Sequence, residues 1–140
     1  HRWPSLTLLK CKTWVMGHVH PVIVFRDPAG FKITRQVWIK INCDSMELTK
    51  ILLQKHKIKI ENTPEKTLIE NFKIKPKTCK LFIMPSFNDL LGGRPLNERK
   101  TSEKIVGPVL RSDAVNLGEA EVYLLDGTFL GTLNQLKNLS

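Results

Sequence analysis

The sequence predicts an α+β fold in which one main helix packs on a mixed β-sheet. Two alternating apolar runs, Val22–Phe25 and Phe31–Ile41, are joined by a tight turn. A capped helix follows at Asp44, and a last hairpin turns around Asp126-Gly127. This order of strands and helices is that of an α+β domain with a mixed sheet.

Three strands are expected before the first helix. Leu6–Met16 is rich in strand-forming residues, alternates loosely and ends at Gly17, and Val22–Phe25 is a short apolar run. Residues 27–30 are Asp-Pro-Ala-Gly, which supply a side-chain acceptor, a fixed φ and a residue that accepts positive φ. The chain is therefore expected to reverse there.

The third strand, Phe31–Ile41, alternates most clearly. Its odd positions are apolar except Arg35, and its even positions are polar except Trp38. Because successive side chains of a strand point to opposite faces, we expect the odd positions in the core and the even positions in water.

Two helices are expected after this strand. Asp44 is an N-cap, and Glu47 follows three residues later, as in a capping box whose glutamate reaches back to the cap. The residues expected to face the sheet are Leu48, Ile51 and Leu52. Thr63 caps the second helix, with Pro64 at its first position. Its apolar residues are Leu68, Ile69 and Phe72.

The rest of the chain is expected to add a strand at Lys80–Met84, a helical turn or two at Glu98–Val106, and a hairpin. In that hairpin, Glu121–Leu125 and Phe129–Leu133 are joined through Asp126-Gly127, which suits the positive φ values of a tight turn.

Length and composition favour one globular domain. The chain has 140 residues, of which 41% are hydrophobic and 25% charged. We expect an extra strand in residues 1–17, the main core in residues 18–125 and a hairpin arm in residues 126–140. No apolar run approaches the about 20 residues of a membrane-spanning helix.

The cysteines argue for a reducing compartment, the cytoplasm or the nucleus. Cys11, Cys43 and Cys79 are odd in number and widely spaced, which disfavours a disulfide framework. We expect them to be buried free thiols that pack as small apolar residues.

The net charge of +9 is unevenly distributed. Residues 1–80 carry 16 Lys/Arg against 6 Asp/Glu, whereas residues 81–140 carry 6 against 7. Such a field attracts an acidic protein, a nucleic acid or an anionic membrane surface. Lysine outnumbers arginine 16 to 6, which disfavours the bidentate phosphate or guanine recognition that arginine provides.

The order of elements from Val22 to Leu125 resembles the ubiquitin-like β-grasp fold. The loop Gly93-Arg94-Pro95-Leu96-Asn97-Glu98 is similar to the loop before the last strand of that fold, here Val122–Leu125. An insertion at Lys59–Thr78 is similar to that of Ras-association-type relatives. The alternative is an OB-fold, whose three strands, helix and two strands would also account for Leu6–Met16.

The β-grasp resemblance implies a non-catalytic module that binds an acidic protein, either a small GTPase or a subunit of a larger complex. In Ras-association-type relatives the second strand pairs with the edge strand of the GTPase, helped by basic side chains. The residues that the resemblance implicates here are Lys32, Arg35, Lys40, Lys50 and Lys57.

The OB-fold alternative implies nucleic-acid binding by the same basic half. Trp38 would stack on a base, whereas in a β-grasp module it would anchor a protein partner. The residues that would contact phosphates are Lys55, Lys57, Lys59, Lys73, Lys75 and Lys77. A purely structural interpretation also stays open, with solvated lysines and a covered Trp38.

The sequence predicts no enzyme, no cofactor and no metal site. His18 and His20 alternate, but no second close pair of ligands completes a zinc site. Residues 91–94, Leu-Gly-Gly-Arg, lack the lysine of a phosphate-binding loop.

Overall fold

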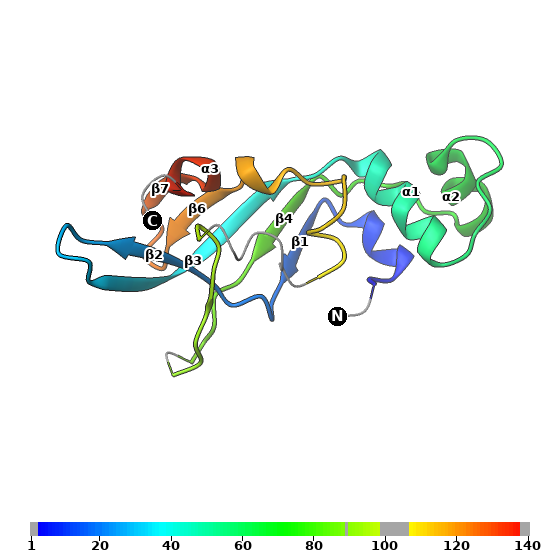
Figure 1. Cartoon of the computed structure of the whole chain (residues 1–140). Coiled ribbons are helices and arrows are strands. Elements are labelled where there is room, and N and C mark those ends of the chain that lie inside the picture. The colour runs from blue at the N-terminus through cyan, green and yellow to red at the C-terminus, as the bar shows by residue number, and fades with distance from the viewer. Residues whose placement is uncertain (1–2, 89, 99–106, 138–140) are drawn as a thin grey trace. The chain divides into compact units, whose positions relative to one another are not determined.

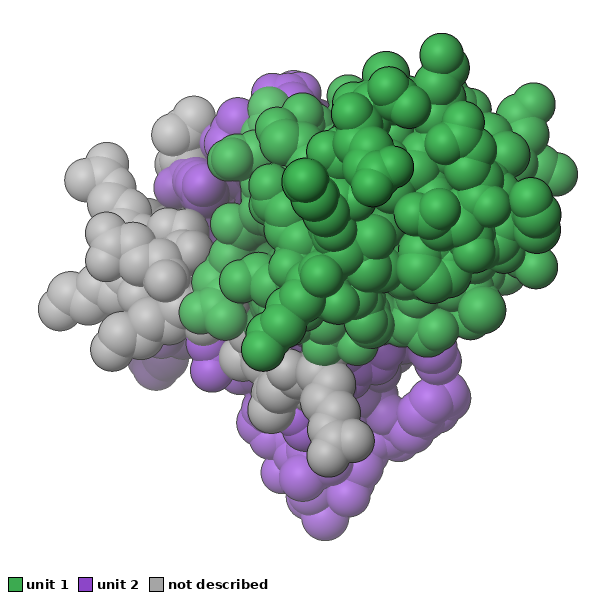
Figure 2. All heavy atoms as spheres, turned by 90° about the vertical axis from the view of Figure 1, so that its right-hand side faces the viewer, with its two compact units in different colours: residues 1–14, 42–80, 106–116 green, residues 15–41, 81–105, 117–140 purple. Residues whose placement is uncertain are grey.

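A computed structural model of the chain describes residues 3–88, 90–98 and 107–137 (Figure 1). The fold is α+β with a mixed sheet, as predicted. The chain divides into two compact units, each built from three segments (Figure 2). Unit 1 comprises residues 1–14, 42–80 and 106–116, and unit 2 comprises residues 15–41, 81–105 and 117–140.

Unit 2 holds most of the sheet. The strand order is β1-β4-β3-β2-β5, with β6 paired to β3 and β7 paired to β6. β2 pairs antiparallel with β3 and parallel with β5. The strands are β1 (Thr13–Met16), β2 (Pro21–Arg26), β3 (Lys32–Asn42), β4 (Lys80–Ile83), β5 (Arg94–Pro95), β6 (Glu121–Leu124) and β7 (Phe129–Thr132).

The predicted turn between β2 and β3 is confirmed. The Gly30 N–H donates to the Asp27 carbonyl at 2.9 Å, and the Asp27 carboxylate accepts from the Phe31 N–H at 2.8 Å. Gly30 has a φ of 89°, which suits glycine. Val22 therefore faces Gln36 across the hairpin, and Arg26 faces Lys32.

The predicted alternation of β3 is confirmed only in its second half. Val37, Ile39 and Ile41 are buried. Phe31 and Ile33, expected in the core, are instead 71% and 48% exposed. Alternation fixes the face to which a side chain points, but it does not show how much of that face the rest of the chain covers.

The predicted strand at Leu6–Met16 is wrong over its first half. Leu6–Lys10 is a 3-10 helix, η1, and β1 begins at Thr13. The Ser5 hydroxyl accepts from the Thr7 N–H at 3.4 Å and caps the turn. Leu6 and Leu9 are three residues apart and both buried, which one turn of 3-10 helix allows.

Unit 1 contains helices α1 (Ser45–Lys55) and α2 (Pro64–Phe72), and α1 packs against α2 and η1. The predicted cap at Asp44 is confirmed, since its carboxylate accepts from the Met46 and Glu47 amides. The predicted reciprocal contact, in which the Glu47 side chain bonds back to the Asp44 N–H, is wrong. The Asp44 N–H donates to the Ala114 carbonyl at 2.8 Å, and Glu47 pairs with Lys50 at 3.3 Å.

The cores of the two helices differ from the predicted sets. Leu48 and Leu52 are fully buried, but Leu53 replaces Ile51 as the third buried apolar residue of α1. The predicted cap and proline of α2 are confirmed. Leu68 is fully buried, whereas Ile69 and Phe72 are 38% and 40% exposed, so only part of the predicted apolar side of α2 is covered.

The predicted last hairpin is confirmed as β6 and β7. The Leu124 N–H donates to the Thr128 carbonyl at 2.9 Å, and Gly127 has a φ of 88°. The second strand ends one residue earlier than predicted, because Thr132 caps helix α3 (Leu133–Leu136) in a capping box with Gln135. A short 3-10 helix, η3 (Leu117–Glu119), precedes β6. The predicted helical turn at Glu98–Val106 lies mostly outside the described residues.

The prediction of buried cysteines is wrong. Cys11 is exposed, and Cys43 and Cys79 are partly exposed. All three are free thiols.

Candidate functional site

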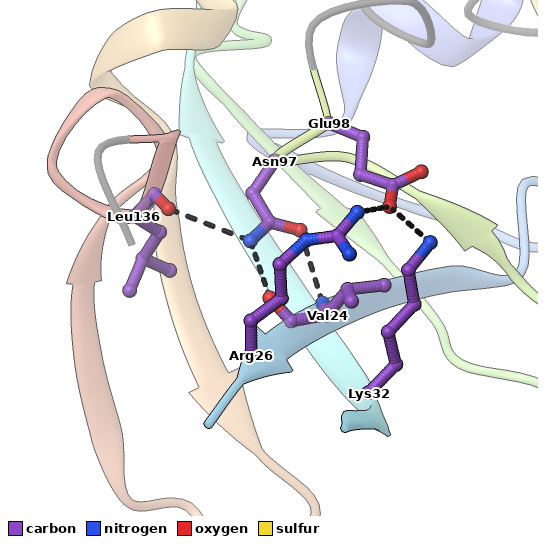
Figure 3. Close-up of polar contacts among 6 residues, drawn as sticks. All are labelled: Val24, Arg26, Lys32, Asn97, Glu98 and Leu136. Carbon is purple, nitrogen blue, oxygen red and sulfur yellow. Dashed lines mark hydrogen bonds and ion pairs between the residues drawn. The ribbon is translucent and has the colours of Figure 1, made fainter. Parts of the chain in front are cut away.

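A buried asparagine fixes the β2–β3 hairpin of unit 2 (Figure 3). Asn97 is fully buried, and its Nδ2 donates to the Val24 carbonyl at 2.8 Å while its Oδ1 accepts from the Val24 N–H at 3.0 Å. Nδ2 also lies 3.4 Å from the Leu136 carbonyl. The Leu96 N–H donates to the Val22 carbonyl at 3.0 Å, so the Asn97 amide continues the β2–β5 ladder beyond β5.

The next residue, Glu98, holds two cations of the hairpin. Its carboxylate Oε1 lies 3.3 Å from both the Arg26 guanidinium and the Lys32 ammonium (Figure 3). Lys32 was predicted to contact a partner, and the structure pairs it within the chain. Arg26 and Lys32 therefore share one carboxylate.

Lys40, another predicted site residue, is also paired. Its Nζ lies 2.7 Å from the Glu121 carboxylate on β6, which also accepts from the Tyr123 hydroxyl. The hydrogen bond to Glu121 is the largest cause of the raised pKa of Lys40. The bond to the same carboxylate also raises the pKa of Tyr123.

Trp38 lies directly across from Tyr123 in the β3–β6 pair and is half-buried. The Tyr123 ring is 5.2 Å from the ring of Phe129 on β7. Trp38 therefore belongs to a row of aromatic residues across three strands of unit 2, and does not stand alone among cations as the predicted stacking platform would.

Of the three predicted site cations on β3, Arg35 is the one that forms no ion pair with a described residue. It is exposed, and no carboxylate lies within ion-pair distance of it in the described residues. Arg35 and Ile33 are two positions apart on β3, so their side chains point to the same face of the sheet. Phe25 on β2 lies directly opposite Ile33 and shares that face, because opposite residues of an antiparallel pair point the same way. We define Phe25, Phe31, Ile33 and Arg35 as the hairpin surface.

A groove of about 630 Å³ in unit 2 adjoins Arg35. Its walls include Leu91 and Leu125, which are 51% and 58% exposed. Gly93 also lines it, and a Cβ at Gly93 would lie 2.0 Å from the Val22 side chain and 2.8 Å from the His20 carbonyl oxygen. Only glycine therefore lets this wall lie directly against β2.

The other seven predicted site residues all lie in unit 1. Lys50 pairs with Glu47, the Lys55 ammonium lies 5.4 Å from the centre of the Trp3 ring, and the Lys73 ammonium donates to the Glu70 carbonyl at 3.3 Å. The remaining four are exposed and have no ion pair with any described residue; this unit 1 lysine group is Lys57, Lys59, Lys75 and Lys77.

The predicted site residues are thus divided, with Lys32, Arg35, Trp38 and Lys40 in unit 2 and the others in unit 1. The charge follows the same division. Unit 1 carries 13 Lys/Arg against 6 Asp/Glu, a net of +7, and unit 2 carries 9 against 7, a net of +2. Sequence reasoning missed Phe31 and Ile33 as surface residues and missed Glu98 and Glu121 as partners of the strand cations.

No protein-family model, curated protein or solved structure matches the chain. Within residues 3–88, 90–98 and 107–137, no group of three or more His, Cys, Asp and Glu side chains is placed to hold a metal ion. None of the helices in that part of the chain has the length and apolar character needed to cross a bilayer.

Proposed function

We propose that this chain is a non-catalytic interaction module that binds an acidic protein through the hairpin surface, with Arg35 at the centre of the contact. The observation that supports the proposal is the exposure of Phe31 (71%) and Ile33 (48%) beside an arginine with no carboxylate partner in the described residues. Aromatic residues and arginine are the residues that most often dominate binding energy at protein interfaces.

The charge of the region favours an acidic partner. Unit 2 carries a net +2, and Arg35 has no carboxylate within ion-pair distance among the described residues. A partner carboxylate on Arg35 would form a charge-assisted, two-pronged hydrogen bond.

The mode of binding uses side chains. β3 lies between β4 and β2 in the strand order, so it is an interior strand of the sheet. The strand pairing that the Ras-association resemblance implies is therefore not part of the proposal, although the class of partner, an acidic protein such as a small GTPase or a subunit of a larger complex, is the same. The Asn97 and Glu98 contacts hold the hairpin before binding, which lowers the entropy lost on association.

The test compares Arg35→Glu with Arg111→Glu. Both arginines are exposed, and both variants have the same net charge, but Arg111 lies in unit 1. The two variants and the unaltered chain are immobilised and exposed to nuclease-treated cell extract, and each retained protein is quantified and then titrated in purified form. We expect Arg35→Glu to weaken binding of an acidic protein at least about tenfold, or about 1.4 kcal/mol, with little effect of Arg111→Glu.

Phe31→Ser is the second variant for this test, and Val15→Ser is its control, because Val15 on β1 is also an exposed apolar residue (63%). We expect only Phe31→Ser to reduce binding. Equal retention by Arg35→Glu and Arg111→Glu, or equal loss in both apolar variants, would contradict the proposal.

A second candidate function is nucleic-acid binding by unit 1. It is favoured by the net charge of +7 in that unit and by the unit 1 lysine group, whose four ammonium groups have no ion pair with described residues. Lysines of this kind contact phosphates without reading the base sequence.

Fluorescence anisotropy with single-stranded DNA, single-stranded RNA and duplex probes at several salt concentrations tests this candidate. If it is correct, affinity falls steeply with salt, because each phosphate contact releases a counterion. Changing Lys57, Lys59, Lys75 and Lys77 to Gln should reduce the slope for a single strand by about 2 to 3. Absence of micromolar binding at low salt would exclude this function.

A further inference from the structure

Two cysteines distant in sequence are neighbours in unit 1. The Cys43 N–H donates to the Cys79 carbonyl at 3.0 Å, although the residues are 36 positions apart. Cys43 directly follows β3 and precedes the cap of α1, and Cys79 directly precedes β4. Both thiols are free and partly open to solvent.

The spacing suits a disulfide bond. Hydrogen-bonded extended segments lie about 4.7–5.5 Å apart, and disulfides join residues whose Cα atoms are about 4.4–6.8 Å apart. The two thiols also interact. Burial is the largest cause that raises the pKa of Cys43 to about 11, and the nearby Cys79 is the next.

The backbone around both cysteines is already fixed. The Cys79 N–H donates to the Lys12 carbonyl at 3.0 Å, and the buried Thr78 hydroxyl donates to the Cys11 carbonyl at 2.7 Å. On the other side, Cys43 forms a β-bridge with Val115. The two backbone segments that carry the cysteines therefore stay adjacent in the reduced chain.

We propose that Cys43 and Cys79 are a reversible redox pair that forms a disulfide when the chain meets a peroxide. Burial raises the pKa of Cys43 and makes its thiolate scarcer, and we assign the first reaction with the peroxide to Cys79. The Cys79 thiol gives up its proton and its sulfur attacks a peroxide oxygen. The O–O bond breaks, and with hydrogen peroxide the leaving hydroxide takes up that proton and departs as water while the sulfenic acid forms. The Cys43 sulfur then attacks the Cys79 sulfur, the S–O bond breaks, and a second water carries away the oxygen and the proton.

The two thiols thus lose two electrons and two protons to one peroxide, and a dithiol reductant reverses the reaction by exchange. A pair of this kind is compatible with a reducing compartment, where disulfides are mostly transient or redox-sensing. The pair is independent of the proposed binding function.

The bond would close a loop that contains both α1 and α2. All seven predicted site residues of unit 1 lie inside it, namely Lys50, Lys55, Lys57, Lys59, Lys73, Lys75 and Lys77. Closing a loop of this length restricts the unfolded chain and should raise the Tm by about 10 °C.

The experiment treats the full chain with hydrogen peroxide and analyses it by mass spectrometry without reduction. We expect an intact mass lower by two hydrogen atoms, a tryptic species joining residues 41–50 to residues 78–80, a raised Tm, and reversal of all three by dithiothreitol. Cys11→Ser, which removes the exposed thiol, should behave in the same way.

Cys43→Ser and Cys79→Ser should lose both the cross-link and the rise in Tm, and circular dichroism of the reduced forms checks that they fold. Cys43→Ala provides a second variant if the serine form does not fold. A Cys11–Cys79 cross-link, a disulfide-linked dimer as the main product, or separate sulfinic acids in place of the bond would overturn the proposal.

Discussion

At the scale of the residue, the structure uses single carboxylates to hold pairs of polar groups. Glu98 binds Arg26 and Lys32, and Glu121 binds Lys40 and Tyr123. Each glutamate thus forms an ion pair with a lysine of β3, Glu98 with Lys32 and Glu121 with Lys40. This is why Arg35, with no such partner in the described part of the chain, becomes the centre of the proposed contact.

Tyr123 reports on the Glu121 contact because it is the only tyrosine in the chain. The hydrogen bond that its hydroxyl donates to Glu121 raises its pKa, so we expect the ultraviolet titration of tyrosinate to have its midpoint above the ordinary value of about 10. Glu121→Gln should lower that midpoint, and Glu119→Gln, at an exposed glutamate, should not. An unchanged midpoint in Glu121→Gln would refute the contact.

The same shifts set the sign of the pH dependence of stability. The pKa values of Tyr123, Lys40 and Cys43 are all raised in the folded chain, so the unfolded chain releases these protons at lower pH than the folded chain. Their contribution is fully present below about pH 9 and is lost as the pH rises through the raised values. Urea unfolding of the reduced chain at pH 8 and pH 11 should therefore give a lower free energy of unfolding at pH 11, and an equal or higher value would contradict this prediction.

At the scale of the element, α1 and α2 end in the same unusual way. Each is followed by a lysine with positive φ, Lys57 at 58° and Lys73 at 55°. After α1, the Ile58 N–H donates to the Leu53 carbonyl at 2.9 Å and the Lys57 N–H to the Gln54 carbonyl at 3.0 Å, as in a Schellman motif. Glycine is the usual residue at this position because it has no Cβ to clash.

Replacing these lysines with glycine should therefore stabilise the chain. We expect Lys57→Gly to raise the free energy of unfolding by about 0.5–1 kcal/mol. Lys73→Gly should gain less, since the Lys73 ammonium also donates to the Glu70 carbonyl. Lys57→Ala is the matched control, because it removes the charge but keeps the Cβ. Urea unfolding measures all three, and an equal gain in Lys57→Ala would assign the effect to charge and not to the backbone.

The elements that the sequence predicted well are those specified by adjacent residues. The Asp44 and Thr63 caps, the Asp27–Gly30 turn and the Asp126-Gly127 hairpin each depend on residues a few positions apart. The capping box of Thr132 and Gln135 is of the same kind, and this signal in the sequence would have identified α3. The β-grasp resemblance and the binding function stay predictions.

The features that could not be predicted depend on distant residues. The Asn97 amide bonds Val24, which is 73 positions away, and nothing near Asn97 in the sequence indicates that partner. In the same way, the alternation of β3 specifies one face for both Ile33 and Ile39, but only Ile39 is covered. The proposed site depends on the exposure of Ile33. That exposure is set by how residues distant in the sequence pack, so the residues near Ile33 do not predict it.

At the scale of the whole molecule, the chain passes repeatedly between two units that differ in charge. Unit 1 carries a net +7 and unit 2 a net +2. In unit 2, Arg26, Lys32 and Lys40 are held by carboxylates, whereas the unit 1 lysine group has no carboxylate partner among the described residues. We therefore expect unit 1 to bind polyanions more strongly than unit 2, and by more than the difference in their net charges alone would predict.

Two variants of equal net charge test this prediction on a heparin column. One changes Lys57, Lys59, Lys75 and Lys77 to Gln, and the other changes Arg26, Lys32, Arg35 and Lys40 to Gln, so each lowers the net charge from +9 to +5. The unit 1 variant should elute at clearly lower salt, because its lysines act on the polyanion directly, whereas three of the unit 2 cations are partly neutralised by Glu98 and Glu121. Circular dichroism melts of both variants check that each is folded. Elution of the two at the same salt concentration would mean that the polyanion responds to total charge alone, and the division of charge between the units would then have no consequence for binding.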